Sequence, residues 1–192
     1  MGFFSERISK IRQTFRVAGV VREQEETPSL KGKIFLKAYE GDKLVYEYES
    51  PNVIVNTASV LIARLLKDSS EPTAGISYLA VGSGNNSWDK FDPPAPTTSQ
   101  TRLENEFYRK AVDYKTFVHP ETGEPTTSQT NIVDYSTSFS EAQAVGPIVE
   151  MSLFGGDATA ELNTGTMVNW RTFPVVNKTA SMTLTVIFRI TS

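Results

Sequence analysis

The chain has 192 residues, of which 39% are hydrophobic, so it is long enough to bury one substantial core. Lys and Arg total 19 against 22 Asp and Glu, and the resulting net charge of −3 disfavours nucleic acid as the main partner. The absence of cysteine excludes disulfides, thiolate catalysis and cysteine-based metal sites. No apolar run approaches the ~20 residues needed to span a bilayer, and the first residues lack the pattern of a signal peptide.

The first segment is expected to form a short amphipathic helix. Phe4, Ile8, Ile11 and Phe15 follow the alternating four- and three-residue spacing of an apolar helical seam. A helix of about sixteen residues is marginal alone in water, so the seam needs a surface to pack against. The body of the same chain, a partner protein, other copies of the seam and a membrane surface are all possible surfaces.

Charge and composition separate this segment from the rest of the chain. Residues 1–22 carry a net charge of +4, which leaves −7 for the remainder. The acidic, polar stretch that follows ends at Pro28 and is typical of a linker. These features predict an N-terminal helical arm with its linker at 1–30, reaching out from a folded body at 31–192.

The body is expected to be mainly β, an antiparallel β-sandwich with one packed α-helix. A turn at Gly41 joins the first two strands into a hairpin, and Thr57 caps an apolar helix over 58–66 that we expect to be pressed into the sheet. Eight or nine strands are expected, near 33–39, 43–48, 50–56, 75–82, 111–118, 131–139, 147–154, 166–176 and 182–190.

The last strand has the clearest pattern. Alternate residues are apolar and predict a core-facing side, namely Met182, Leu184, Val186, Phe188 and Ile190. The opposite side carries Thr183, Thr185 and Arg189, and only Ile187 interrupts its polar character. Ile187 is therefore a candidate contact with another subunit.

A Pro-rich irregular loop at 83–100 carries two large aromatic residues, Trp88 and Phe91. Such residues either close the end of a sandwich or contact another chain. Together with Tyr78 they could instead form a stacking surface for a carbohydrate or a receptor.

No constellation of residues predicts catalysis or metal binding. The sole histidine, His119, lies in a polar hairpin tip, and Glu104 and Glu106 lie in a charged segment that is expected to face water. The Gly-Ser-Gly sequence at 82–84 lacks the ending of a phosphate-binding loop and is better explained as a turn. Asp89 and Asp92 do not make an oxygen cage for a cation. We therefore expect no enzyme activity, no cofactor and no metal.

Several short motifs occur in a distinctive order along the body. Asn-Val-Ile-Val-Asn-Thr at 52–57 is followed by Ile-Ser-Tyr-Leu-Ala-Val-Gly-Ser-Gly at 76–84 and Thr-Arg-Leu-Glu-Asn-Glu at 101–106, and the order closes on Leu-Phe-Gly-Gly-Asp-Ala at 153–158 and Leu-Asn-Thr-Gly at 162–165. In this order, the chain resembles small structural proteins of tailed-bacteriophage virions over residues 32–191. The resemblance implies a self-assembling subunit of the virion, with no catalytic residues.

The sequence thus predicts a structural subunit of the tail, neck or fibre-attachment region, made in the host cytoplasm and built into the virion. Its expected partners are copies of itself and other virion structural proteins, with neither nucleic acid nor a membrane among them. The alternatives are a carbohydrate- or receptor-binding module and, more weakly, a membrane-surface adaptor that acts through the basic arm.

Overall fold

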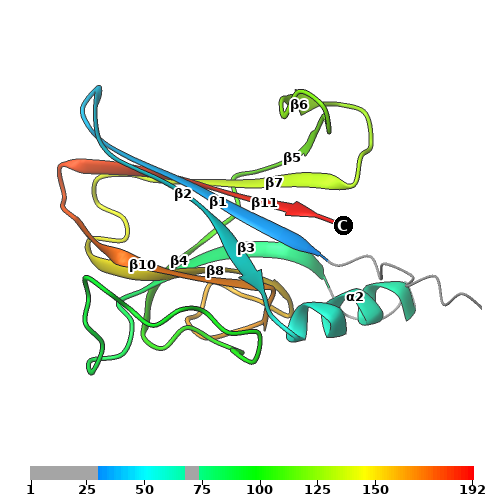
Figure 1. Ribbon diagram of the computed structural model, residues 1–192, viewed down its shortest axis with the longest axis horizontal. Helices are drawn as coiled ribbons and strands as arrows, with labels where there is room; N and C mark the ends of the chain where they lie inside the picture. The colour runs from blue at the N-terminus through cyan, green and yellow to red at the C-terminus, as the bar shows by residue number, and fades with distance from the viewer. Residues whose placement is uncertain (1–29, 68–73) are drawn as a thin grey trace, which may run out of the picture.

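The computed structural model describes residues 30–67 and 74–192, which form a mainly β structure with one short helix (Figure 1). The helix, α2, spans Thr57–Lys67. The eleven strands of the described residues are β1 (Lys31–Glu40), β2 (Lys43–Ile54), β3 (Ala74–Gly82), β4 (Glu106–Ala111), β5 (Tyr114–Val118), β6 (Pro125–Thr126), β7 (Ile132–Phe139), β8 (Gly146–Gly156), β9 (Thr166–Met167), β10 (Asn169–Lys178) and β11 (Met182–Thr191).

The described strands pair antiparallel into one sheet in the order β4-β3-β8-β10-β2-β1-β11-β7-β5-β6, with β9 added beside β8. Strand β11 pairs with β1 along its whole length, from Lys31 opposite Thr191 to Glu40 opposite Met182. Strands β2 and β10 pair only through Asn169 with Ile54 and Trp170 with Val53. This short pairing is a corner, and on either side of it the two parts of the sheet lie as two layers (Figure 1).

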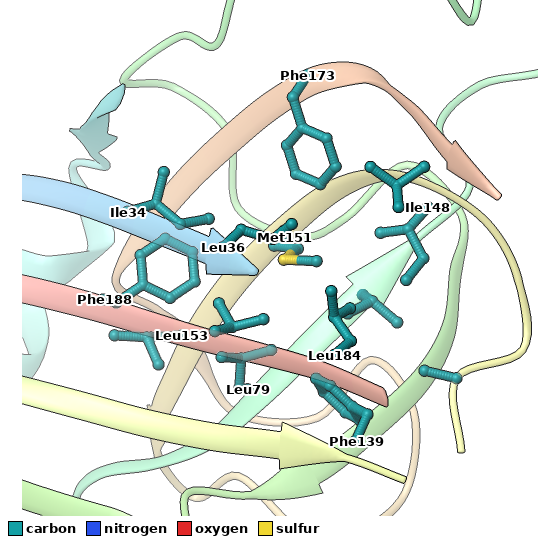
Figure 2. Packing of buried hydrophobic residues seen from close by; sticks show 14 of the residues in the cluster. Ile34, Leu36, Leu79, Phe139, Ile148, Met151, Leu153, Phe173, Leu184 and Phe188 are labelled. Carbon is teal, nitrogen blue, oxygen red and sulfur yellow. The ribbon is translucent and has the colours of Figure 1, made fainter. Parts of the chain in front are cut away.

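The main hydrophobic core lies between these two layers (Figure 2). Ile34 and Leu36 from β1 and Phe188 from β11 meet Leu79 from β3 and Met151 from β8, and all five side chains are fully buried. The alternation predicted for the last strand is confirmed, because Met182, Leu184, Val186, Phe188 and Ile190 are buried while the residues between them are half-buried.

A second hydrophobic cluster lies on the other face of the layer formed by β3, β8 and β10. Its members include Ala80, Phe154 and Trp170, with the half-buried Trp88 packed against it. The long loop between β3 and β4, drawn in green below that layer in Figure 1, passes over this face. Strand β8 is therefore buried on both faces from Ile148 onward, which explains why its sequence lacks a simple alternation.

The expected hairpin and helix are both present. Gly41 has a φ of +55° in the β1–β2 turn, a conformation that suits glycine. Thr57 was expected to cap this helix but is its first residue, and its hydroxyl donates a hydrogen bond of 2.7 Å to the carbonyl oxygen of Met167. The expectation that the helix is pressed into the sheet is wrong for most of its surface, because only Ala58 and Leu61 of its residues are buried. The strand count exceeds the expected one partly because β6 and β9 are only two residues long.

Candidate assembly surfaces

The loop between β3 and β4 is tied to the body by hydrogen bonds along its length. The Lys90 ammonium donates to the carbonyl oxygens of Ser83 and Asn85, each at 2.7 Å. The backbone carbonyl oxygen of Lys90 in turn accepts from the amide of Val175 in β10 at 2.8 Å. Farther along, the Thr172 hydroxyl donates to the carbonyl oxygen of Pro94 at 2.7 Å. The loop is thus a fixed part of the surface, although it has no regular secondary structure.

The two ends of this loop meet at a buried carboxylate, Glu150 of β8. Its Oε1 accepts from the amides of Gly84 at 3.2 Å and Asn105 at 3.1 Å, and its Oε2 accepts from the indole nitrogen of Trp170 at 3.0 Å. Burial raises the pKa of Glu150, and these donated hydrogen bonds oppose the rise by stabilising the carboxylate. Glu150 therefore fixes the two ends of the loop by hydrogen bonds, on a face of the layer that is otherwise apolar.

The Gly-Ser-Gly sequence at the start of the loop has a structural role. A Cβ at Gly82 would lie 2.6 Å from Glu150 Oε1, and Gly84 has a φ of +65° with Trp88 directly against it. Both glycines are therefore required by close packing and by the turn. This agrees with the prediction of a turn at this sequence.

The two aromatic residues predicted as contacts have different environments. Trp88 is half-buried and packs on Trp170, with ring centroids 6.2 Å apart. Phe91 is 77% exposed, and its amide is held by the Asp89 carboxylate at 2.9 Å. Tyr78 is also half-buried, with the Arg109 guanidinium 5.9 Å from its ring centroid. The three rings therefore do not form one exposed stacking platform, and Phe91 is the ring of the three that is largely exposed.

Ile187 lies on the outward face of β11, opposite Phe35 of β1 and Ser136 of β7. It is half-buried, and Arg189 follows it on the same face of the strand. Arg189 donates to both carboxylate oxygens of Asp134 at 2.8 and 2.9 Å and also lies 5.4 Å from the Phe35 ring centroid. Ile187 thus lies on the outer face beside the half-buried ring of Phe35 and close to the ion pair of Arg189 with Asp134.

The other predicted contact residues, Phe4, Ile8, Ile11 and Phe15, lie outside the residues that the structure describes. The expected arm at 1–30 therefore remains a prediction from the sequence.

The residues weighed for chemistry have structural environments. His119 is exposed, and its Nδ1 accepts from the amides of Glu121 and Thr122 at 3.3 and 3.4 Å, as in a turn. Glu106 was expected to face water, but its side chain is fully buried against Arg109. No strand was expected over Glu106–Ala111, and it is this strand, β4, in which both Glu106 and Arg109 are buried. Within 30–67 and 74–192, no cluster of three or more His, Asp and Glu could hold a metal ion.

The part of the chain that the structure describes contains no helix long and apolar enough to cross a membrane. The surfaces that stand out are instead an anchored loop with an exposed aromatic residue and a helix with an exposed apolar side. Such features are typical of proteins that bind other proteins.

Comparison with known families found a match. The profile of the family described as "Baseplate wedge 3 tail fiber network component" matches residues 53–146, just under half of the chain. This protein is a structural component of the phage tail baseplate. The baseplate protein is thus a virion component that interacts with other virion proteins, and it is not an enzyme. Searches of curated proteins and of solved structures found no match.

The matched segment runs from the end of β2 to the start of β8 in the baseplate protein. It includes α2 and the loop that carries Phe91. Ile187 and the N-terminal residues lie outside it. The prediction of a structural subunit in a tailed-phage virion is confirmed, and the baseplate is one of the tail positions that this prediction covered.

Proposed function

We propose that the baseplate protein is a rigid connector that joins neighbouring subunits of a baseplate wedge and its tail-fibre network. Three surfaces would make the contacts: the loop with Trp88 and Phe91, the outer face of β11 around Ile187, and the N-terminal arm. The observation that carries the proposal is Phe91, which is 77% exposed on a loop tied to the body at both ends. A preorganised aromatic side chain binds with little loss of conformational entropy, and aromatic residues dominate the energetics of interfaces.

The loop contact can be tested with a single substitution in the full chain. Phe91→Ala should shift the purified protein toward lower mass in analytical ultracentrifugation, or weaken its co-purification with other virion proteins. Its thermal unfolding should not change, because the ring is mostly in water. Leu162→Ala is the control, since Leu162 is 44% exposed on the loop between β8 and β9, outside the three proposed surfaces. Unchanged assembly by the Phe91 variant would contradict the role of this loop.

Ile187 would act as a second contact on the opposite layer. Its side chain is half-buried between neighbouring strands, yet its outer part faces the polar surface around Arg189. Ile187→Glu should therefore weaken assembly while leaving thermal unfolding of the monomer nearly unchanged. If this substitution unfolds the monomer, Ile187 is a core residue and not a contact.

The arm would supply the third contact, through Phe4, Ile8, Ile11 and Phe15 docked on a neighbouring subunit. This assigns the chain an assembly segment at 1–30 and a body at 31–192. We further regard the body as a β-sandwich whose layers are joined at the β2–β10 corner. The shared core between the two layers and the short pairing at that corner support this description.

A further inference from the structure

Helix α2 has an apolar side that the body does not cover. Of its larger aliphatic residues only Leu61 is buried, whereas Leu66 is 81% exposed, Val60 55% and Leu65 46%. A surface helix normally turns its apolar stripe toward the core and its polar residues toward water. Contiguous exposed apolar surface of this kind marks an interaction site.

Two grooves accompany this exposed side of α2. One, of about 340 Å³, lies between α2, the start of β7 and the end of β11, and its walls include Leu65, Val133 and Ile190. The other, of about 470 Å³, lies between α2 and the end of β2, and its walls include Ile54 and Leu66. Together the two grooves form an apolar binding surface on both sides of α2.

Leu30 lines both grooves and is the first residue that the structure describes. The 29 residues that precede it therefore join the body at the grooves. These residues contain the apolar seam of Phe4, Ile8, Ile11 and Phe15, which requires an apolar surface to pack against. The body offers such a surface next to Leu30, where the N-terminal segment joins it.

The chemistry of the linker indicates which copy of the segment fills the grooves. Glu23, Glu25 and Glu26 repel one another and favour an extended chain, and Pro28 disfavours a helical conformation at Thr27. A linker of this kind favours a path away from the grooves of its own body. The net charge of +4 on residues 1–22 attracts that segment to any body of this chain, because residues 30–192 carry −4.

We propose that the two grooves beside α2 are the acceptor for residues 1–22 of a neighbouring copy of this chain. The proposal rests on the proposed function, in which the arm joins subunits, and it names the surface that the arm binds. Because the donor and acceptor surfaces differ, each copy binds one neighbour and is bound by another. Such head-to-tail contacts build a ring when the rotation closes and a filament when it does not.

A photo-crosslinking experiment on the full chain tests the proposal. Leu66 is replaced by the photoreactive amino acid benzoylphenylalanine, which keeps the position apolar and exposed. Copies labelled with ¹⁴N and ¹⁵N are mixed as dilute subunits, concentrated and irradiated, and the crosslinked peptides are identified by mass spectrometry. We expect crosslinks from position 66 to residues 1–22, with mixed-isotope pairs among them. The control carries the photoreactive residue at Val145, which is exposed in the segment between β7 and β8. This segment follows the end of β7 that lies away from α2, so the control should give no crosslink to the arm.

Three results would overturn the proposal. Arm crosslinks that are all of a single isotope would mean that each copy binds its own arm. The other two results are crosslinks from position 66 only to other regions and the absence of any crosslink. A second measurement separates this failure from failure of the proposed function. Leu66→Glu should shift the assembly toward monomer as deletion of residues 1–22 does, while Val145→Glu should not. If the deletion alone reduces the mass, the arm is a joint but these grooves are not its acceptor. If the deletion has no effect, the arm is not a joint.

Discussion

Arg109 and Glu106 form a fully buried ion pair within strand β4, with Arg109 Nη2 2.8 Å from Glu106 Oε2. The same guanidinium donates from Nη1 to the carbonyl oxygens of Thr159 and Thr164, at 3.1 and 2.9 Å. The Glu106 carboxylate also accepts from the amide of Asn163 at 3.1 Å. The pair therefore holds the loop between β8 and β9 against the edge of the sheet.

Glu106→Gln should destabilise the baseplate protein by about 3–5 kcal/mol, because it leaves the Arg109 charge buried without a counter-charge. Urea unfolding followed by circular dichroism measures this loss. Lys33→Ala is the comparison. It breaks the ion pair between Lys33 and Glu49, whose side chains are 44% and 54% exposed, and it should change stability little. Equal effects of the two variants would contradict a stabilising role specific to the buried pair.

Phe188→Ala should also cost about 3–5 kcal/mol, since it opens a cavity where β11 packs against the opposite layer. Thr185→Ala, on the outward face of the same strand, removes one exposed hydrogen bond to Ser138 and should have little effect. The difference between the two free energies of unfolding is the measurement. A small loss for Phe188→Ala would mean that the layers repack freely around the missing ring.

The stability of the fold should depend on the protonation of Glu150. Burial raises the pKa of this carboxyl in the folded state above its value in the unfolded chain, so the folded state binds the proton more readily. The contribution of Glu150 to stability should therefore rise as the pH falls through the raised pKa, and level off below the unfolded value.

This pH dependence is measured as the difference in free energy of unfolding between wild type and Glu150→Gln. Glutamine does not titrate, so the difference should move in favour of wild type on acidification from neutral pH. A difference that stays constant, or moves in favour of the variant, would show that Glu150 does not titrate in this way.

Deletion of residues 1–22 should leave a folded body with an unchanged melting temperature and a smaller assembled mass. The reason is that the described body already has its own core between the two layers. Circular dichroism and analytical ultracentrifugation check the two parts of this prediction. Unfolding of the shortened chain would place the arm in the core and not at a joint.

Local patterns in the sequence were enough to determine much of the fold. The alternation along β11, the turn at Gly41 and the start of α2 at Thr57 depend on neighbouring residues, so each could be read directly from the chain. The order of motifs in the body was also enough to indicate a structural protein of a tailed-phage virion.

Tertiary structure decided which faces are covered, because burial depends on elements that are distant in sequence. Glu106 is buried since the loop at 157–165 covers it, and Trp88 is half-buried since Trp170 lies 6.2 Å away. The apolar residues of α2 are partly exposed because the helix lies at one end of the described structure, where none of the described strands packs against one of its sides (Figure 1). Sequence periodicity identifies an apolar face, but only the packing of the whole chain determines whether that face is buried in the protein or left for a partner.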